Sequence, residues 1–178
     1  MTSTLFTNIG ELRTVSERGT LNDAAIVAED GVITWIGEAA KAPEADRAED
    51  LGGAAVLPGW VDSHTHMVFD GNRAEEFEAR MSGGEYAAGG IAVTMEATRS
   101  AGAERLDELV AARVAAARAG GTTTLETKTG YGLDTASEKQ AAEIAGRHVD
   151  EVTFLGAHLV PPGADAGEYV DLVCGEML

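Results

Sequence analysis

Apolar and polar residues in the first part of the chain form short runs that are interrupted by turns. Residues 24–28 and 32–36 are rich in alanine, valine and isoleucine, and they flank Glu29-Asp30-Gly31. Asp-Gly between two such runs is a strong hairpin signal, because both residues tolerate a positive φ. A further apolar run ends at Pro58-Gly59. The pattern predicts that residues 1–57 form part of a small β-sandwich domain.

Beyond residue 57 the spacing of the apolar residues changes. Residues 60–69 form an apolar run with a polar end, which predicts a buried strand. Helices are expected over 73–81 and 104–119, separated by a glycine-rich loop through residues 83–90. The longer helix has apolar residues at the spacing of one helical face: Leu106, Leu109, Val110, Val114 and Ala117.

The rest of the chain alternates strand and helix. Residues 122–127 predict a β-branched strand, 134–146 a helix capped by Thr135 or Ser137, and 152–158 a strand that ends at His158. This alternation predicts βαβ units with a parallel sheet. Residues 58–178 amount to about half of the ~250 residues of a closed eight-stranded barrel. We therefore expect either a small open α/β domain or a truncated barrel.

Composition and charge exclude several classes of function. The formal net charge is −17, from 30 acidic and 13 basic residues, so nucleic acid and anionic membranes would be repelled. The sequence contains no run of eighteen apolar residues, so it predicts no membrane span. The first residues lack the pattern of a secretory signal. One cysteine, Cys174, cannot form an internal disulfide, which fits a reducing cytoplasm. We expect a cytoplasmic protein that acts on a small molecule.

The segment Trp60-Val61-Asp62-Ser63-His64-Thr65-His66 offers the clearest candidate chemistry. On a strand, residues two apart point to the same face, so His64 and His66 are expected to project together. Two neutral imidazoles so placed can bind one divalent metal. A bare His-x-His is more often two polar residues at an exposed strand end. The Pro-Gly turn and the apolar run before this pair favour metal binding.

At this point the chain resembles a known family. Pro58-Gly59 followed by two apolar residues, Asp62, His64 and His66 is similar to the first barrel strand of the amidohydrolase superfamily. Four segments that occur in the same order narrow the resemblance to the imidazolonepropionase family. The segments are 64–78, 89–99, Lys128-Thr129-Gly130-Tyr131-Gly132-Leu133 and Phe154-Leu155-Gly156-Ala157-His158. Between Tyr86 and Gly90 the chain is shorter than the family pattern.

The resemblance implies roles for five residues. His64 and His66 would bind one divalent metal ion, zinc or iron. Arg73 would bind the substrate's propionate, since a guanidinium fits a carboxylate bidentately; without the resemblance, a surface arginine paired with a nearby glutamate would be preferred. Tyr131 would contact the substrate through its hydroxyl and His158 would contact the imidazolone ring, although a packed turn tyrosine and a structural histidine are the plainer alternatives. Lys128 is left unassigned, and His148 is expected to be solvated.

The resemblance also implies a reaction and a fold. The complete enzyme would open 4-imidazolone-5-propanoate to N-formimidoyl-L-glutamate in histidine degradation, as a homodimer. Residues 1–57 would be part of a composite sandwich, and residues 58–178 would be about the first three βα units of an incomplete (β/α)8 barrel. The family's later histidine and carboxylate groups are not in this chain, so no catalytic residue is assigned. We expect these 178 residues alone to be inactive; the alternatives are a non-catalytic remnant, half of a split protein, or an amidohydrolase for another cyclic amide or amidine.

Overall fold

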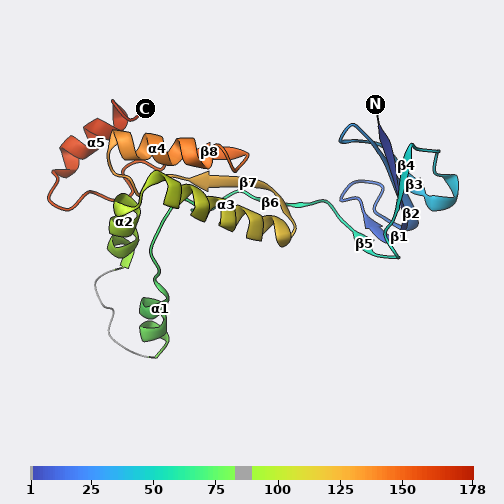
Figure 1. Cartoon of the computed structure of the whole chain (residues 1–178), viewed down its shortest axis with the longest axis horizontal. Helices are drawn as coiled ribbons and strands as arrows, with labels where there is room; N and C mark the ends of the chain where they lie inside the picture. Colours follow the sequence, from blue (N-terminus) through green and yellow to red (C-terminus); the bar gives the residue numbers. More distant parts are fainter. Residues whose placement is uncertain (1, 83–89) are drawn as a thin grey trace. The chain divides into compact units, whose positions relative to one another are not determined.

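The computed structural model describes residues 2–82 and 90–178. The chain divides into two compact units, the first ending at Pro58 and the second beginning at Gly59 (Figure 1). Most of the predicted glycine-rich loop and the position of its shortening lie at residues 83–89, outside the described residues. No helix in the described ranges is both long enough and apolar enough to cross a bilayer.

The first unit is a five-stranded sheet built around its first strand. Strand β2 pairs antiparallel with β1 and with β3, while β4 and β5 pair parallel with the two halves of β1. Asp30 and Gly31 both have positive φ, 47° and 84°, so the predicted hairpin is confirmed. The strands are β1 (Ser3–Arg13), β2 (Thr20–Glu29), β3 (Val32–Glu38), β4 (Arg47–Asp50) and β5 (Ala55–Val56), and Ala39–Lys41 form a short 3-10 helix.

The apolar residues of this sheet gather into one small core. Ile9, Leu12 and Ala24 are buried there, with Ile26 and Ile36 packed against them. Val32 and Ile33 of β3 remain exposed. The described residues of this unit form a single sheet, so a composite sandwich stays a prediction.

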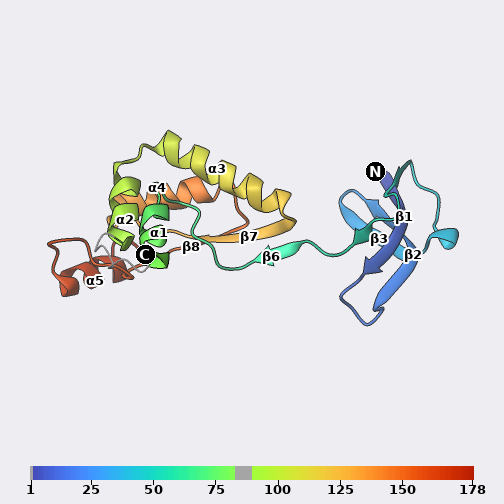
Figure 2. The same ribbon diagram turned by 90° about the horizontal axis from the view of Figure 1, so that it is seen from below.

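The second unit contains a parallel three-stranded sheet in the order β6-β7-β8. This confirms the predicted βαβ organisation, and helices α3 and α4 lie beside the sheet (Figures 1 and 2). The strands are β6 (Trp60–Asp62), β7 (Thr122–Lys128) and β8 (Glu151–Thr153). The helices are α1 (Ala74–Met81), α2 (Gly90–Ser100), α3 (Ala103–Ala119), α4 (Thr135–Ala145) and α5 (Ala166–Cys174).

The main core of the second unit lies between these two helices and the sheet. Val110 of α3, Leu125 of β7 and Ile144 of α4 are almost fully buried in it. Because side chains alternate across a strand, Leu125 points toward the helices while Glu126 and Lys128 point to the opposite face. This opposite face of the sheet is where the candidate site lies.

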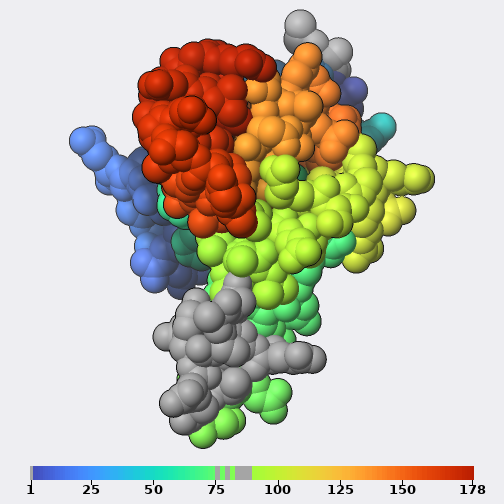
Figure 3. Space-filling model, turned by 90° about the vertical axis from the view of Figure 1, so that its left-hand side faces the viewer, coloured from blue at the N-terminus to red at the C-terminus, as the bar shows by residue number. Residues whose placement is uncertain are grey.

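A second cluster joins α2 to α5. Met95, Leu133, Tyr169 and Val173 are buried together, with Tyr131 packed against them. In the space-filling view the red segment that carries α5 lies beside the orange segment that carries α4 and β8 (Figure 3). The cluster therefore connects the C-terminal helix to the loop after β7.

Two strand predictions were wrong. Strand β6 is three residues long and exposed, with Trp60 at 59% and Val61 at 68% of full exposure. Among the described residues it pairs with β7 alone, and the core takes up Val68 instead. Strand β8 ends at Thr153, because the chain turns at Gly156 and Ala157, the latter with a φ of 56°. His158 therefore lies in a turn and not at a strand end.

Three further predictions need correction, two of them about helices. Helix α2 was not predicted; it begins at a glycine and is rich in β-branched residues, so the burial of Thr94, Met95 and Thr98 must stabilise it. Helix α4 is capped by Asp134, whose carboxylate accepts a hydrogen bond from the Ser137 backbone at 2.8 Å. Neither Thr135 nor Ser137 is the cap.

The third correction concerns His148, which was expected to be solvated. Its Nε2 atom lies 2.8 Å from an Asp107 carboxylate oxygen, which Arg147 also contacts at 2.7 Å. The side chain of His148 is only 21% exposed. His148 therefore helps to link the end of α4 to α3.

Candidate active site

The two metal-ligand candidates lie just beyond the end of β6. There the chain continues beside β7, because the Lys128 amide donates to the Thr65 carbonyl at 2.9 Å and the Met67 amide donates to the Thr127 hydroxyl at 2.8 Å. The imidazole rings of His64 and His66 have centroids 5.5 Å apart. The structure therefore brings the two rings together.

The surroundings of His66 favour a neutral imidazole. Burial lowers the pKa of His66, and the nearby His64, His158 and Lys128 lower it further, while Glu126 acts in the opposite direction. Its Nδ1 atom is buried and has no hydrogen-bond partner among the described residues. A neutral ring with a buried, unpartnered nitrogen has the properties of a metal ligand.

Two further candidates extend this row of rings. The Tyr131 ring centroid lies 6.1 Å from that of His66 and 5.9 Å from that of His158. Nδ1 of His158 is 3.0 Å from the Leu155 carbonyl oxygen. His158 thus reaches the site although β8 ends five residues before it.

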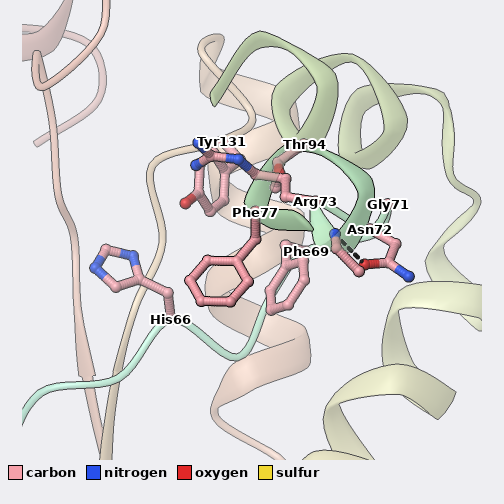
Figure 4. Close-up of a pocket in the computed structure, with 9 residues that line it drawn as sticks. His66, Phe69, Gly71, Asn72, Arg73, Phe77, Thr94 and Tyr131 are labelled. Carbon is pink, nitrogen blue, oxygen red and sulfur yellow. Dashed lines mark hydrogen bonds between the residues drawn. The ribbon is translucent and has the colours of Figure 1, made fainter. Parts of the chain in front are cut away.

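The fifth candidate, Arg73, shares a cavity with His66 and Tyr131. The cavity has a volume of about 450 Å³. In Figure 4, His66 lies at one side of it, and Arg73 extends in the direction of Tyr131. The rings of Phe69 and Phe77 give the cavity an apolar part between polar groups. A small molecule with an acid tail and a polar ring fits this distribution of groups.

One polar pair beside the site was missed in the sequence. Nζ of Lys128 lies 2.6 Å from Glu126, and both side chains are at most 14% exposed. Burial raises the pKa of Glu126, but hydrogen bonds from Lys128, Thr153 and Thr65 outweigh it, so the pKa is lowered overall. The available signal was the spacing Glu126-x-Lys128, which places both residues on one face of the strand. Lys128 is thus paired and lies close enough to influence His66.

The structure thus brings all five sequence-predicted site residues together, while their roles stay predictions. His64 and His66 could hold a metal ion. Within the ranges 2–82 and 90–178, no group of three or more histidine, cysteine or acidic residues is arranged to hold one. Catalytic zinc sites usually have three protein ligands and an open position.

Comparison with known proteins gives close relatives along the whole chain. Imidazolonepropionase from Saccharopolyspora erythraea is 63% identical over 100% of this chain and 46% of its own length. Those from Micrococcus luteus and Streptomyces coelicolor are 62% and 52% identical, over 46% and 47% of their lengths. The chain thus spans about half the length of these relatives. No protein-family model matches it.

Solved structures with a similar fold are more distant in sequence. An atrazine chlorohydrolase from Arthrobacter aurescens, solved with zinc, matches 88% of this chain and 36% of its own with a TM-score of 0.58 at 17% identity. An ochratoxinase from A. niger matches 96% of this chain and 36% of its own with a TM-score of 0.57 at 20% identity. At these identities the likeness shows the fold alone.

Proposed function

Because the chain belongs to the imidazolonepropionase family and spans about half the length of its members, we propose that it supplies the metal-binding and substrate-anchoring part of a cyclic-amide hydrolase. The reaction is the opening of 4-imidazolone-5-propanoate to N-formimidoyl-L-glutamate. The chain has the mixed α/β fold of amidohydrolases. We further propose that residues 58–178 are the first three βα units of a (β/α)8 barrel, and residues 1–57 part of a composite sandwich.

One observation carries this proposal. The buried Nδ1 atom of His66 is without a partner among the described residues, while the His66 ring lies beside that of His64 and the residue lines the cavity that Arg73 also lines. When bound, a divalent metal would polarise the substrate carbonyl and lower the pKa of water. Imidazole ligands suit zinc and iron alike.

The residues of the chain itself would bind and orient the substrate. The Arg73 guanidinium would form two parallel hydrogen bonds with the propionate, which fixes both its position and its orientation. The Tyr131 hydroxyl and the His158 imidazole would contact the ring. Phe69 and Phe77 would exclude water from the apolar part of the substrate.

Metal titration tests the first step. Zinc binding to the purified chain is measured by calorimetry for the wild type, for His66→Gln and for the control His148→Gln. Because His66 is a proposed ligand and His148 pairs with Asp107 on another surface, we expect His66→Gln alone to weaken binding by about tenfold or more. Equal affinities for the wild type and His66→Gln would refute the metal site.

Binding of an unreactive analogue tests the anchor. Imidazole-4-propanoate is titrated into the zinc-loaded chain, and Arg73→Lys is compared with the control Arg118→Lys on α3. A lysine keeps the charge but loses the bidentate fork, so only the Arg73 variant should bind the analogue several-fold more weakly. Unchanged binding would refute the role of Arg73.

We propose that these 178 residues do not turn over substrate by themselves. Two histidines make an incomplete catalytic site, and the described residues offer no group of three. An assay of the zinc- or iron-loaded chain with imidazolone propionate should show no activity, and robust turnover would refute this. We also propose a cytoplasmic location and a homodimeric complete enzyme; light scattering of a complete enzyme tests the dimer.

A further inference from the structure

The loop between β7 and α4, which carries Tyr131, is held by a buried carboxylate. Glu138, in the first turns of α4, is only 6% exposed. Its two oxygens accept three backbone hydrogen bonds, from Gly130 at 2.8 Å, Gly132 at 2.7 Å and Leu133 at 2.9 Å. Both oxygens of the carboxylate are therefore bound to amides on either side of Tyr131.

The same loop is closely packed and has no room for a side chain at either glycine. A Cβ atom at Gly130 would lie 2.7 Å from both His158 Cε1 and the Leu155 oxygen, and one at Gly132 would lie 2.8 Å from the Glu138 nitrogen. Leu133 has a φ of 61°, in the left-handed region that a leucine seldom occupies. A strained residue of this kind persists only where its surroundings over-determine its conformation. The hydrogen bond from Leu133 to Glu138 is one such constraint.

A second side chain holds the loop from another helix. Arg99, near the end of α2, donates a hydrogen bond to the Gly132 carbonyl and lies 3.1 Å from an Asp134 oxygen. The amide of Gly132 is thus bound by Glu138 and its carbonyl by Arg99. Helices α2 and α4 together fix the backbone directly after Tyr131.

We propose that Glu138 and Arg99 are positioning residues, which set the ring of Tyr131 against His66 and His158. A carboxylate suits this task because three N–H donors converge on Glu138, and both of its oxygens can accept. A glutamine there would turn an NH2 group toward at least one of these donors. The role of the Tyr131 ring in substrate contact rests on the proposed function, whereas its placement by Glu138 and Arg99 is independent of metal and substrate.

The test is Glu138→Gln in the purified chain, with Glu143→Gln as the control. Both residues lie on α4, but Glu143 is exposed and forms a long 3.9 Å pair with Lys139. Amide exchange is measured for the loop and for β7. We expect exchange at Gly130, Gly132 and Leu133 to accelerate by about tenfold or more, as for loss of charge-assisted hydrogen bonds, while β7 is unchanged. A uniform acceleration, or none, would overturn the proposal.

A second readout follows the ring itself. In the apo protein, nuclear Overhauser contacts are recorded between the Tyr131 ring and the His66 ring, whose centroids lie 6.1 Å apart. Glu138→Gln and Arg99→Met should each lose these contacts, while Glu143→Gln keeps them. Retained contacts in both test variants would refute the positioning role. Because no metal or analogue is present, this failure is distinguishable from failure of the metal and anchor tests.

Discussion

Arg113 links the stability of α3 to the segment that follows the histidine pair. Its Nη1 atom donates to the carbonyl oxygens of Met67 at 2.7 Å and Phe69 at 2.6 Å, and its guanidinium lies 3.6 Å from the centre of the Phe69 ring. Burial lowers the pKa of Arg113, which Asp70 partly opposes, and an arginine remains charged. The change Arg113→Met removes the charge and the donors but keeps a long side chain of similar reach.

The expected loss can be estimated from these contacts. A hydrogen bond from a charged donor contributes about 1.5–3 kcal/mol, and a cation–π contact about 0.5–1 kcal/mol where it is partly exposed. Met67 and Phe69 are only half-buried, so water can replace part of what the guanidinium provides. We therefore expect Arg113→Met to lower the free energy of unfolding by about 3.5 kcal/mol, the low end of the summed contributions.

Urea unfolding followed by circular dichroism measures this loss, with Arg118→Met as the control. Arg118 lies on the same helix and makes one long 3.4 Å bond to the His148 carbonyl, so its replacement should cost about 0.5 kcal/mol or less. Zinc affinity should fall only in the Arg113 variant, because Met67 follows His66 directly. If both variants unfold within 0.5 kcal/mol of each other, Arg113 does not stabilise this segment as reasoned.

Three further predictions address packing, charge and backbone conformation. Ile144 is only 1% exposed, so Ile144→Ala should lower the free energy of unfolding by about 2–5 kcal/mol. A urea midpoint close to that of the wild type would contradict this. Hydrogen bonds from His148 and Arg147 lower the pKa of Asp107 in the folded chain. The contribution of Asp107 to the free energy of unfolding is therefore fully present above the ordinary pKa of 3.8, and it is lost as the pH falls through the lower pKa of the folded state. Asp107→Asn should therefore flatten the acid side of the stability curve; an unchanged acid side would argue against the contacts. Gly31 has a φ of 84° and open space around it, so Gly31→Ala should cost about 1–2 kcal/mol from backbone strain alone, measurable by thermal unfolding of the chain and refuted by an unchanged midpoint.

The elements that sequence predicted well are those whose stability is local. The Asp30-Gly31 turn and the periodic apolar face of α3 both determine structure within a few residues. Helix α2 was missed because it depends on tertiary burial of Thr94 and Met95 and not on helix propensity. The expected burial of β6 failed for a related reason, since an apolar run does not reveal how many neighbours its strand has.

For the candidate site, sequence could propose which residues gather but not what holds them. His64 and His66 follow from a two-residue spacing, and Arg73, Tyr131 and His158 came from the family resemblance. Their supporting residues, such as Glu138 and Arg113, look in the sequence like ordinary charged positions on amphipathic helices. Their supporting role can be recognised only in the folded chain, where α3 and α4 lie beside the loops that these side chains contact.

The alternation along β7 places two kinds of structural constraint within a single strand. Leu125 is 1% exposed in the core that α3 and α4 share, so a change there would require compensating changes in two helices. Glu126 and Lys128, one residue away on either side of Thr127, point to the other face and take no part in that core. New substrate preferences should therefore be sought in the laboratory by changing these two positions together, because replacing one partner of this buried pair would leave the charge of the other unpaired.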